Sequence, residues 1–243
     1  MSRLHRDAMR VLIGEITGGG LAQGDRLPRE QDLAAQFGVS RGVARECVRS
    51  LEERGLITVK HGRGATVAPA TQWDVFDPDV LAALLAGDRG AEVLLEYIEC
   101  RRILEVEAAG LAAERADEAG LQALGAAYDE MTSAAERARV NPAAEPLYRE
   151  ADVAFHRAIV EAARNRALAR MTVPIHRALS TTFAPLARPE HRFERGLPEH
   201  ERILRAIQAG DPEEARSAMR DHLVTIEGYV RASRGDLAAP ARA

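Results

Sequence analysis

The sequence has 243 residues, of which 46% are apolar and 29% charged, so it is long enough to bury a substantial core and we expect two domains. No run approaches the 18 or more apolar residues that a membrane helix needs, and the charged first ten residues do not resemble a secretory signal; we therefore expect a cytoplasmic protein without a membrane partner. Its two cysteines, Cys47 and Cys100, fall in different predicted domains, which argues against a disulfide framework.

Charge is distributed unevenly along the chain. Residues 1–70 carry 11 basic and 8 acidic side chains, a net charge of +3, whereas residues 71–243 carry 22 basic and 29 acidic side chains, a net charge of −7. The overall charge of −4 therefore hides a positive end. Because nucleic acid attracts positive surfaces, residues 1–70 are the part expected to meet it.

Three helices are predicted near the start of the chain. Residues 4–16 carry apolar side chains at helical spacing, and residues 30–37 form a second helix that ends at Gly38, a residue suited to the left-handed conformation of a helix end. Ser40 is suited to capping the third helix. The buried stripe of this third helix is predicted to consist of Ala44, Cys47, Val48 and Leu51.

The third helix is predicted to lift Arg41, Arg45 and Arg49 away from its buried stripe, as a recognition helix in the major groove would. Residues 56–60 and 65–68 then indicate a hairpin with a Gly-rich tip, the wing of a winged helix-turn-helix. An arginine at such a tip can enter a narrow minor groove. The alternative is an ordinary three-helix domain with a solvated basic face.

The motifs LPxExxLA, GVSRxxxRE, LxxxGLI and GRGxxV occur in this order, and together they resemble the winged-helix domain of GntR-family transcription regulators over nearly all of residues 5–68. The resemblance implies binding to a double-stranded DNA operator. The DNA contacts that it implies are Arg29, Gln31, Ser40, Arg41, Gly42, Arg45, His61, Gly62 and Arg63. Gln31 and Gly42 depart from the usual residues of the family, arginine and threonine, which leaves the base preference open.

The rest of the chain is predicted to be all helical. Its segments show a 3.6-residue apolar period and no strand-like alternation, which predicts an antiparallel bundle of six or seven helices and a mainly α fold overall. The expected domains are a winged helix-turn-helix at 1–68, a linker at 69–78, a helical effector- and metal-binding domain at 79–236 and a flexible tail at 237–243.

Polar residues on the apolar stripes of this bundle need an explanation. Asp152 and His156 have the i, i+4 spacing that lets two side chains converge, and His200 and His222 each lie on the apolar stripe of another helix. A shared divalent cation would satisfy all four, with zinc, nickel or manganese suited to one carboxylate and three imidazoles. The alternative is that each histidine is separately hydrogen-bonded in the core.

The segments DVAFHRAIVEAARN and EHERILRAIQAGDPEEARSAMRDHL are similar to the effector-binding helical domain of the FadR-type branch of the GntR family, the FCD domain. In that domain an Asp-xxx-His pair and two later histidines hold the metal. The resemblance therefore implies Asp152, His156, His200 and His222 as the ligands of a divalent metal ion, with zinc as our first expectation.

Arg101 is the other polar residue on an apolar stripe, and a buried guanidinium requires an anion. The family pattern RxxxE implies an arginine there that contacts the carboxylate of an effector. Glu105, one turn further along, is the alternative partner. Arg102 and His176 are further candidates for effector binding.

These observations predict a ligand-responsive transcription regulator that binds DNA as a homodimer, because one short recognition helix reads too few base pairs. We expect a repressor released by a small organic acid. WDVFDPDVLAALL resembles the connection in sugar-acid regulators of this branch, which favours a sugar acid. One alternative is a metal-dependent hydrolase or lyase, but the sequence lacks the motifs HExxH and GxSxG and a phosphate-binding glycine loop. The other alternative is a regulator that senses the metal itself.

Overall fold

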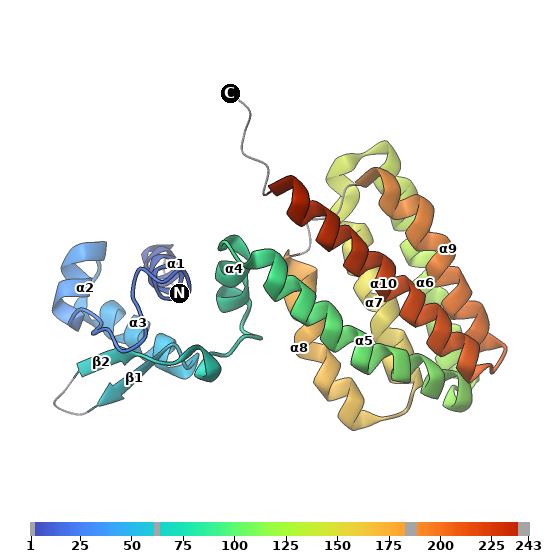
Figure 1. Ribbon diagram of the computed structural model, residues 1–243, viewed down its shortest axis with the longest axis horizontal. Coiled ribbons are helices and arrows are strands. Elements are labelled where there is room, and N and C mark those ends of the chain that lie inside the picture. Colours follow the sequence, from blue (N-terminus) through green and yellow to red (C-terminus); the bar gives the residue numbers. More distant parts are fainter. Residues whose placement is uncertain (1–2, 61–63, 183–188, 238–243) are drawn as a thin grey trace. The chain divides into compact units, whose positions relative to one another are not determined.

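The computed structural model describes residues 3–60, 64–182 and 189–237 of the chain, which forms two compact units, Met1–Val93 and Leu94–Ala243 (Figure 1). The described residues form ten α-helices and one antiparallel sheet of two strands. The predicted mainly α fold is therefore confirmed. The wing-tip residues His61, Gly62 and Arg63 and residues 238–243 of the predicted tail lie outside the described residues.

The N-terminal unit begins with three helices, α1 (Arg3–Thr17), α2 (Glu30–Phe37) and α3 (Arg41–Glu53). Gly38 ends α2 in the left-handed conformation, with φ of 62°, and its N–H donates to Ala34 O. The Ser40 hydroxyl accepts a hydrogen bond of 3.3 Å from the N–H of Val43. Local signals in the sequence therefore set the turn between α2 and α3.

The wing is formed by β1 (Ile57–Lys60) and β2 (Gly64–Val67), paired antiparallel so that Ile57 faces Val67. Gly55, which leads from α3 into β1, has φ of 69°. A Cβ atom at this position would lie 2.0 Å from Gln72 O, so only glycine fits the turn. The predicted hairpin is thus present and begins at a glycine.

The core of the N-terminal unit gathers side chains from all of these elements. On α1 the core side chains include Ala8, Leu12 and Ile16. Leu4 and Val11, which share the predicted helical spacing, are 54% and 46% exposed. The buried stripe of α1 is completed instead by Met9 and Ile13.

The segment 69–78, expected to be a linker, is held against the N-terminal unit. It contains a short 3₁₀ helix, η1 (Ala70–Gln72), and Trp73 donates its indole N–H to Ala68 O at 3.2 Å. Arg54 at the end of α3 forms an ion pair of 3.1 Å with Asp77, and both side chains are largely buried. These contacts hold the segment on the N-terminal unit.

Helix α4 (Pro78–Ala86) follows, capped by Asp77, whose side chain accepts from the N–H groups of Asp79 and Val80. It packs against α1, and Val80 is fully buried in the core of the N-terminal unit. Residues 79–86 were expected to belong to the helical domain. The structure places them in the first unit, because α1 supplies the apolar surface that α4 covers.

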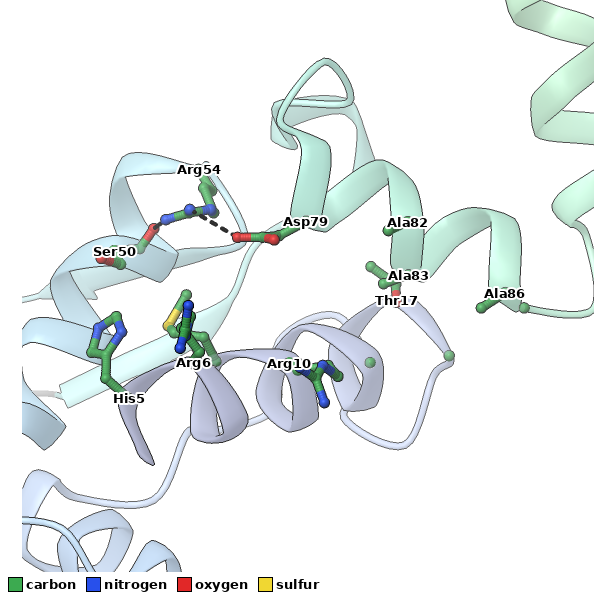
Figure 2. A pocket seen from close by; sticks show the side chains of 14 residues that line it. His5, Arg6, Arg10, Thr17, Ser50, Arg54, Asp79, Ala82, Ala83 and Ala86 are labelled. Atoms are coloured by element: carbon green, nitrogen blue, oxygen red, sulfur yellow. Dashed lines mark hydrogen bonds and ion pairs between the residues drawn. The ribbon is translucent and has the colours of Figure 1, made fainter. Parts of the chain in front are cut away.

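A cleft of about 590 Å³ lies between α1, the end of α3 and α4 (Figure 2). Small residues such as Gly14, Gly18 and Ala83 line part of it, and Figure 2 shows Arg54 bridging Ser50 and Asp79 at its edge. Among the described residues that line the cleft, none is a predicted site residue. The cleft is a consequence of packing α4 on α1 through small side chains.

The second unit is a bundle of α5 (Gly90–Arg115, whose first turn lies in the first unit), α6 (Glu118–Val140), α7 (Glu145–Ala162), α8 (Arg166–Thr182), α9 (Pro189–Gln208) and α10 (Pro212–Leu237), with a short helix η2 (Pro142–Ala144) before α7. Helix α6 packs on α7 and α9, α7 packs on α8, and α9 packs on α10 (Figure 1). The described helices agree with the predicted bundle of six or seven.

Alanine, leucine and aromatic side chains from these helices form one core, in which Met131, Phe155 and Met219 are fully buried. Helix α10 begins as the sequence predicts, since the Asp211 carboxylate accepts a hydrogen bond of 3.0 Å from the N–H of Glu214. In the part of the chain that the structure describes, no helix combines the length and the apolarity needed to cross a bilayer.

Candidate metal centre and DNA-binding surface

Three histidines from three helices of the bundle meet in its core. His156 of α7, His200 of α9 and His222 of α10 are at most 2% exposed. One ring nitrogen of each lies within 4.8 Å of the others. Asp152, one turn before His156, places its Oδ1 atom 3.2 Å from His200 Nε2. All four predicted ligands therefore lie together.

Each imidazole has an oxygen next to its Nδ1 atom. The distances are 2.8 Å from His156 to Glu105 Oε2, 2.6 Å from His200 to Gly196 O, and 2.9 Å from His222 to Glu199 Oε2. The His156 contact is bent, but no described residue offers this nitrogen a better-aligned acceptor. A neutral ring that donates through Nδ1 has its lone pair on Nε2. Donation through Nδ1 in all three rings would direct their Nε2 lone pairs toward one another.

Among the described residues, the Nε2 atoms are only partly satisfied by the protein, and the partner of His200 Nε2 is Asp152. His156 Nε2 and His200 Nε2 are 3.3 Å apart, a distance at which two lone pairs repel each other. His222 Nε2 is buried without a hydrogen-bond partner among the described residues. A cation about 2.0–2.2 Å from each donor would resolve both problems. The residues present therefore fit a divalent metal ion.

The surroundings keep the imidazoles of His156 and His222 neutral, as metal ligands must be. Burial, supported by the nearby Arg101 guanidinium, lowers the pKa of His156 to about 4, despite the opposing effect of Glu105. Burial also lowers the pKa of His222 well below its usual value, followed by the effects of His200 and His156. Both rings are thus free of a second proton at neutral pH.

The charges around the rings also suit a divalent ion. Glu105, Asp152 and Glu199 contribute three carboxylates, and Arg101 contributes one guanidinium. Carboxylates therefore outnumber guanidinium groups around the three rings. Such a surplus of negative charge attracts a divalent cation.

Arg101 is buried, and Glu105 is its partner. Its Nε atom donates to Glu105 Oε1 at 2.8 Å and its second nitrogen donates to Oε2 at 3.2 Å. His176 Nε2, also buried, lies 2.8 Å from the same Oε1 atom. Burial alone would raise the pKa of Glu105, but Arg101 and then His156 hold that pKa well below its usual range. The alternative partner named from the sequence is therefore the one observed.

Arg102 does not join this group. It is exposed on α5 and lies 4.0 Å from Glu99. Two carboxylates at the centre were missed from the sequence, Glu105 as the partner of His156 and Glu199 as the partner of His222. The available signal for Glu105 was its position one turn after Arg101, on the stripe that α5 buries.

The N-terminal unit presents a second candidate site on the outer face of α3. Arg45 is 71% exposed, and its Nε atom lies 3.3 Å from Glu30 Oε2 at the start of α2. Arg49 pairs with Glu53 at 2.9 Å. The other described residues of the predicted DNA surface are all exposed, namely Arg29, Gln31, Ser40, Arg41 and Gly42. The expected basic face is therefore free of core packing.

Comparison with known proteins identifies the families of both domains. The family model for bacterial regulatory proteins of the gntR family matches residues 5–67, and the model for the FCD domain matches residues 96–225. The galactonate operon transcriptional repressor of Escherichia coli is 31% identical over 87% of this chain and 90% of its own length. LutR, an HTH-type transcriptional regulator of Bacillus subtilis, is 34% identical over 87% of this chain and 94% of its own length.

A solved structure of Lar from Listeria monocytogenes, whose title says that it controls the expression of the agr system, aligns with a TM-score of 0.66. It is 20% identical over 96% of this chain and 98% of its own, and it supports the fold alone. The family models and the named relatives describe transcription regulators, which sets aside the hydrolase or lyase alternative. The chain is a ligand-responsive transcription regulator and belongs to the GntR family, in the FadR-type branch that carries an FCD domain.

Proposed function

We propose that this regulator is a repressor that binds its operator as a homodimer and is released when a small organic acid binds at a divalent metal ion in the bundle. The observation that carries the proposal is the convergence of three buried imidazoles, each of which has its Nδ1 atom within 2.9 Å of an oxygen. Asp152 completes the set of ligands. Zinc is the expected metal, and nickel or manganese would suit the same donors.

The proposed effector is a sugar acid. The similarity to a repressor named for galactonate supports this choice, and LutR supports the regulatory role without naming an effector. Four protein ligands leave positions open on a five- or six-coordinate ion, where a carboxylate could bind. Of the residues expected at the effector, His176 and Arg101 lie beside the centre, whereas Arg102 faces solvent.

The proposed DNA contacts are those expected from the sequence. Arg41, Arg45 and the N-terminal end of α3 would read base edges in the major groove, with Arg29 and Gln31 at the start of α2 nearby. Two copies would place two such helices on an operator with two-fold symmetry. The effector can release DNA only if it binds the DNA-free arrangement more tightly than the DNA-bound one.

A titration of DNA affinity tests this function. The full chain is bound to a fluorescent duplex selected in vitro from random sequence, and anisotropy is followed as zinc alone, and then galactonate at fixed zinc, is added. Galactonate is expected to weaken binding by about 5- to 150-fold, the usual range of allosteric coupling. Zinc alone is expected to leave DNA affinity nearly unchanged.

The same titration distinguishes the alternatives. A large response to zinc without any acid would favour a regulator that senses the metal. No response to galactonate, with a response to lactate or to a dicarboxylate, would keep the acid-responsive function and reject the sugar acid. Tighter binding on adding the acid would reject the repressor mechanism.

Arg45→Ala tests the DNA surface. If Arg45 pairs bidentately with a guanine, the variant should lose about 1 to 3 kcal/mol of discrimination between the selected duplex and a scrambled one. The measurement is the ratio of the two dissociation constants at fixed salt concentration. An equal loss on both duplexes would instead assign Arg45 to phosphate contacts.

Arg49→Ala provides a matched control for Arg45→Ala. Arg49 lies on the same helix with nearly the same exposure, 69%, and is already paired with Glu53. The control removes the same charge and should leave the discrimination ratio near that of the unmodified chain. A similar drop in the discrimination ratio of both variants would show that discrimination depends only on the total charge of α3.

A further inference from the structure

Glu105 is the most connected charged group of the bundle core. Its side chain is 1% exposed, yet it contacts three other polar side chains. Arg101 occupies both carboxylate oxygens in a fork, while His156 Nδ1 lies 2.8 Å from one oxygen and His176 Nε2 lies 2.8 Å from the other. The carboxylate therefore links a guanidinium to one of the proposed metal ligands.

We infer that Glu105 and Arg101 act together as a positioning pair for His156, and that they set the affinity of the centre for metal. Glu105 orients the ring and favours the tautomer with the proton on Nδ1, which leaves Nε2 free to bind a cation. Arg101 keeps the buried carboxylate ionised. This inference rests on the proposed metal centre and deepens it.

The geometry gives Arg101 a task besides the expected binding of an effector. Its Nε and one terminal nitrogen each donate to Glu105. A guanidinium has five N–H groups, so three remain for other acceptors. The pairing with Glu105 is therefore compatible with contact between Arg101 and an effector. Removing Arg101 would leave a buried carboxylate beside two imidazoles without its cation, which is strongly unfavourable.

Glu199 makes the corresponding contact with His222, but it is more exposed to solvent than Glu105. Its side chain is 26% exposed, and its other oxygen accepts a hydrogen bond from the Thr225 hydroxyl at 2.9 Å. Water can replace a partly exposed carboxylate more easily than a fully buried one. The larger loss of metal affinity is therefore expected at Glu105.

The test measures zinc affinity of the full chain by competition with a chromophoric chelator, for Glu105→Gln, Arg101→Met and the double variant. Each single variant should weaken zinc binding by about 10- to 100-fold, the range seen when outer partners of metal ligands are removed. The double variant should be little weaker than Glu105→Gln, because both residues act through one contact. The absorption spectrum of bound Co²⁺ should change in the same variants, since it reports ligand geometry.

Glu107→Gln is the matched control. Glu107 lies on the same helix, two residues after Glu105, is 60% exposed and pairs with Arg216 at 3.1 Å. This variant should keep both the zinc affinity and the Co²⁺ spectrum. If Arg101→Met and Glu105→Gln also keep them while His222→Ala loses zinc, the positioning role is overturned. If His222→Ala itself binds zinc normally, the proposed metal centre fails.

The unmodified chain offers a test that does not depend on any variant folding. In metal-free protein with ¹⁵N-labelled histidine, the ring-nitrogen resonances of His156 should show a protonated Nδ1 and an unprotonated Nε2. The proton on Nε2 would overturn the inference. This measurement reports directly which ring nitrogen carries the proton. If Glu105 had a purely structural role, the proton would stay on Nε2, as in the tautomer preferred in water.

Discussion

Replacing His222 with alanine should remove the stabilisation that metal gives to the helical unit. His222 is 2% exposed, and its Nε2 atom is one of the three that converge. At a free metal concentration about 100 times the dissociation constant, binding stabilises a folded protein by about 2.7 kcal/mol. For a unit of this size that is a rise in melting temperature of about 5 to 10 °C. The variant should lose nearly all of it.

The measurement compares melting temperatures in zinc and in a chelator, for the unmodified chain and for the variant. The comparison within each protein matters because removing a buried ring also leaves a cavity, which lowers stability with or without metal. His5→Ala is a matched control, since His5 is also buried, at 7% exposed, but lies in the N-terminal unit. An equal zinc response in His222→Ala and the unmodified chain would contradict the metal centre.

The parts of the fold that sequence predicted well depend on local signals. Gly38 and Ser40 mark the turn between α2 and α3 through their own backbone and side-chain hydrogen bonds, so both boundaries agree with the structure. The spacing of Asp152 and His156 is likewise a property of one helix. Such features need no knowledge of which elements pack together.

The parts that sequence missed depend on packing between distant segments. The contact from Glu105 to His156 joins α5 and α7, and no spacing rule within one helix reveals it. The packing of α4 on α1 was not apparent from the sequence for a similar reason. Asp77 caps this helix in the structure, but only the fold shows that Val80 is buried in the N-terminal core.

The role of Arg101 was predicted only in part. The sequence identified it correctly as a buried cation that needs an anion, and left its partner open between an effector and Glu105. Both partners satisfy the same electrostatic requirement, so composition could not choose. The distances of 2.8 Å and 3.2 Å to the two carboxylate oxygens show that Glu105 is a partner of Arg101, and contact between Arg101 and an effector stays a prediction.

Acid should destabilise the metal-free helical unit well before ordinary carboxylates titrate. The pKa of His156 is lowered to about 4 by burial and by Arg101, whereas an unfolded chain would have the usual value near 6.5. Between these two pH values the unfolded chain binds a proton on this ring and the folded chain does not. The free energy of unfolding therefore falls as pH drops from about 6.5 to about 4, by about 3 kcal/mol for this residue.

His222 should contribute in the same direction, since burial lowers its pKa as well. Below this range, protonation of Glu105 removes further stability, because its pKa is held low in the folded chain by Arg101 and His156. The check is urea unfolding of chelator-treated full chain at pH 7, 6 and 5, with the His156→Gln variant beside it. The variant should show a slope smaller by about 1.4 kcal/mol per pH unit, the contribution of one proton.

A free energy of unfolding that stays level between pH 7 and pH 5 would mean that the buried rings already carry protons in the folded chain. Protonated rings could not donate Nε2 lone pairs to a cation. In zinc, the free energy of unfolding should fall more steeply as the pH drops, because protons then also compete with the metal for each ring. Equal slopes with and without zinc would therefore argue against a metal bound by the three imidazoles, even if the metal-free slope were as large as expected.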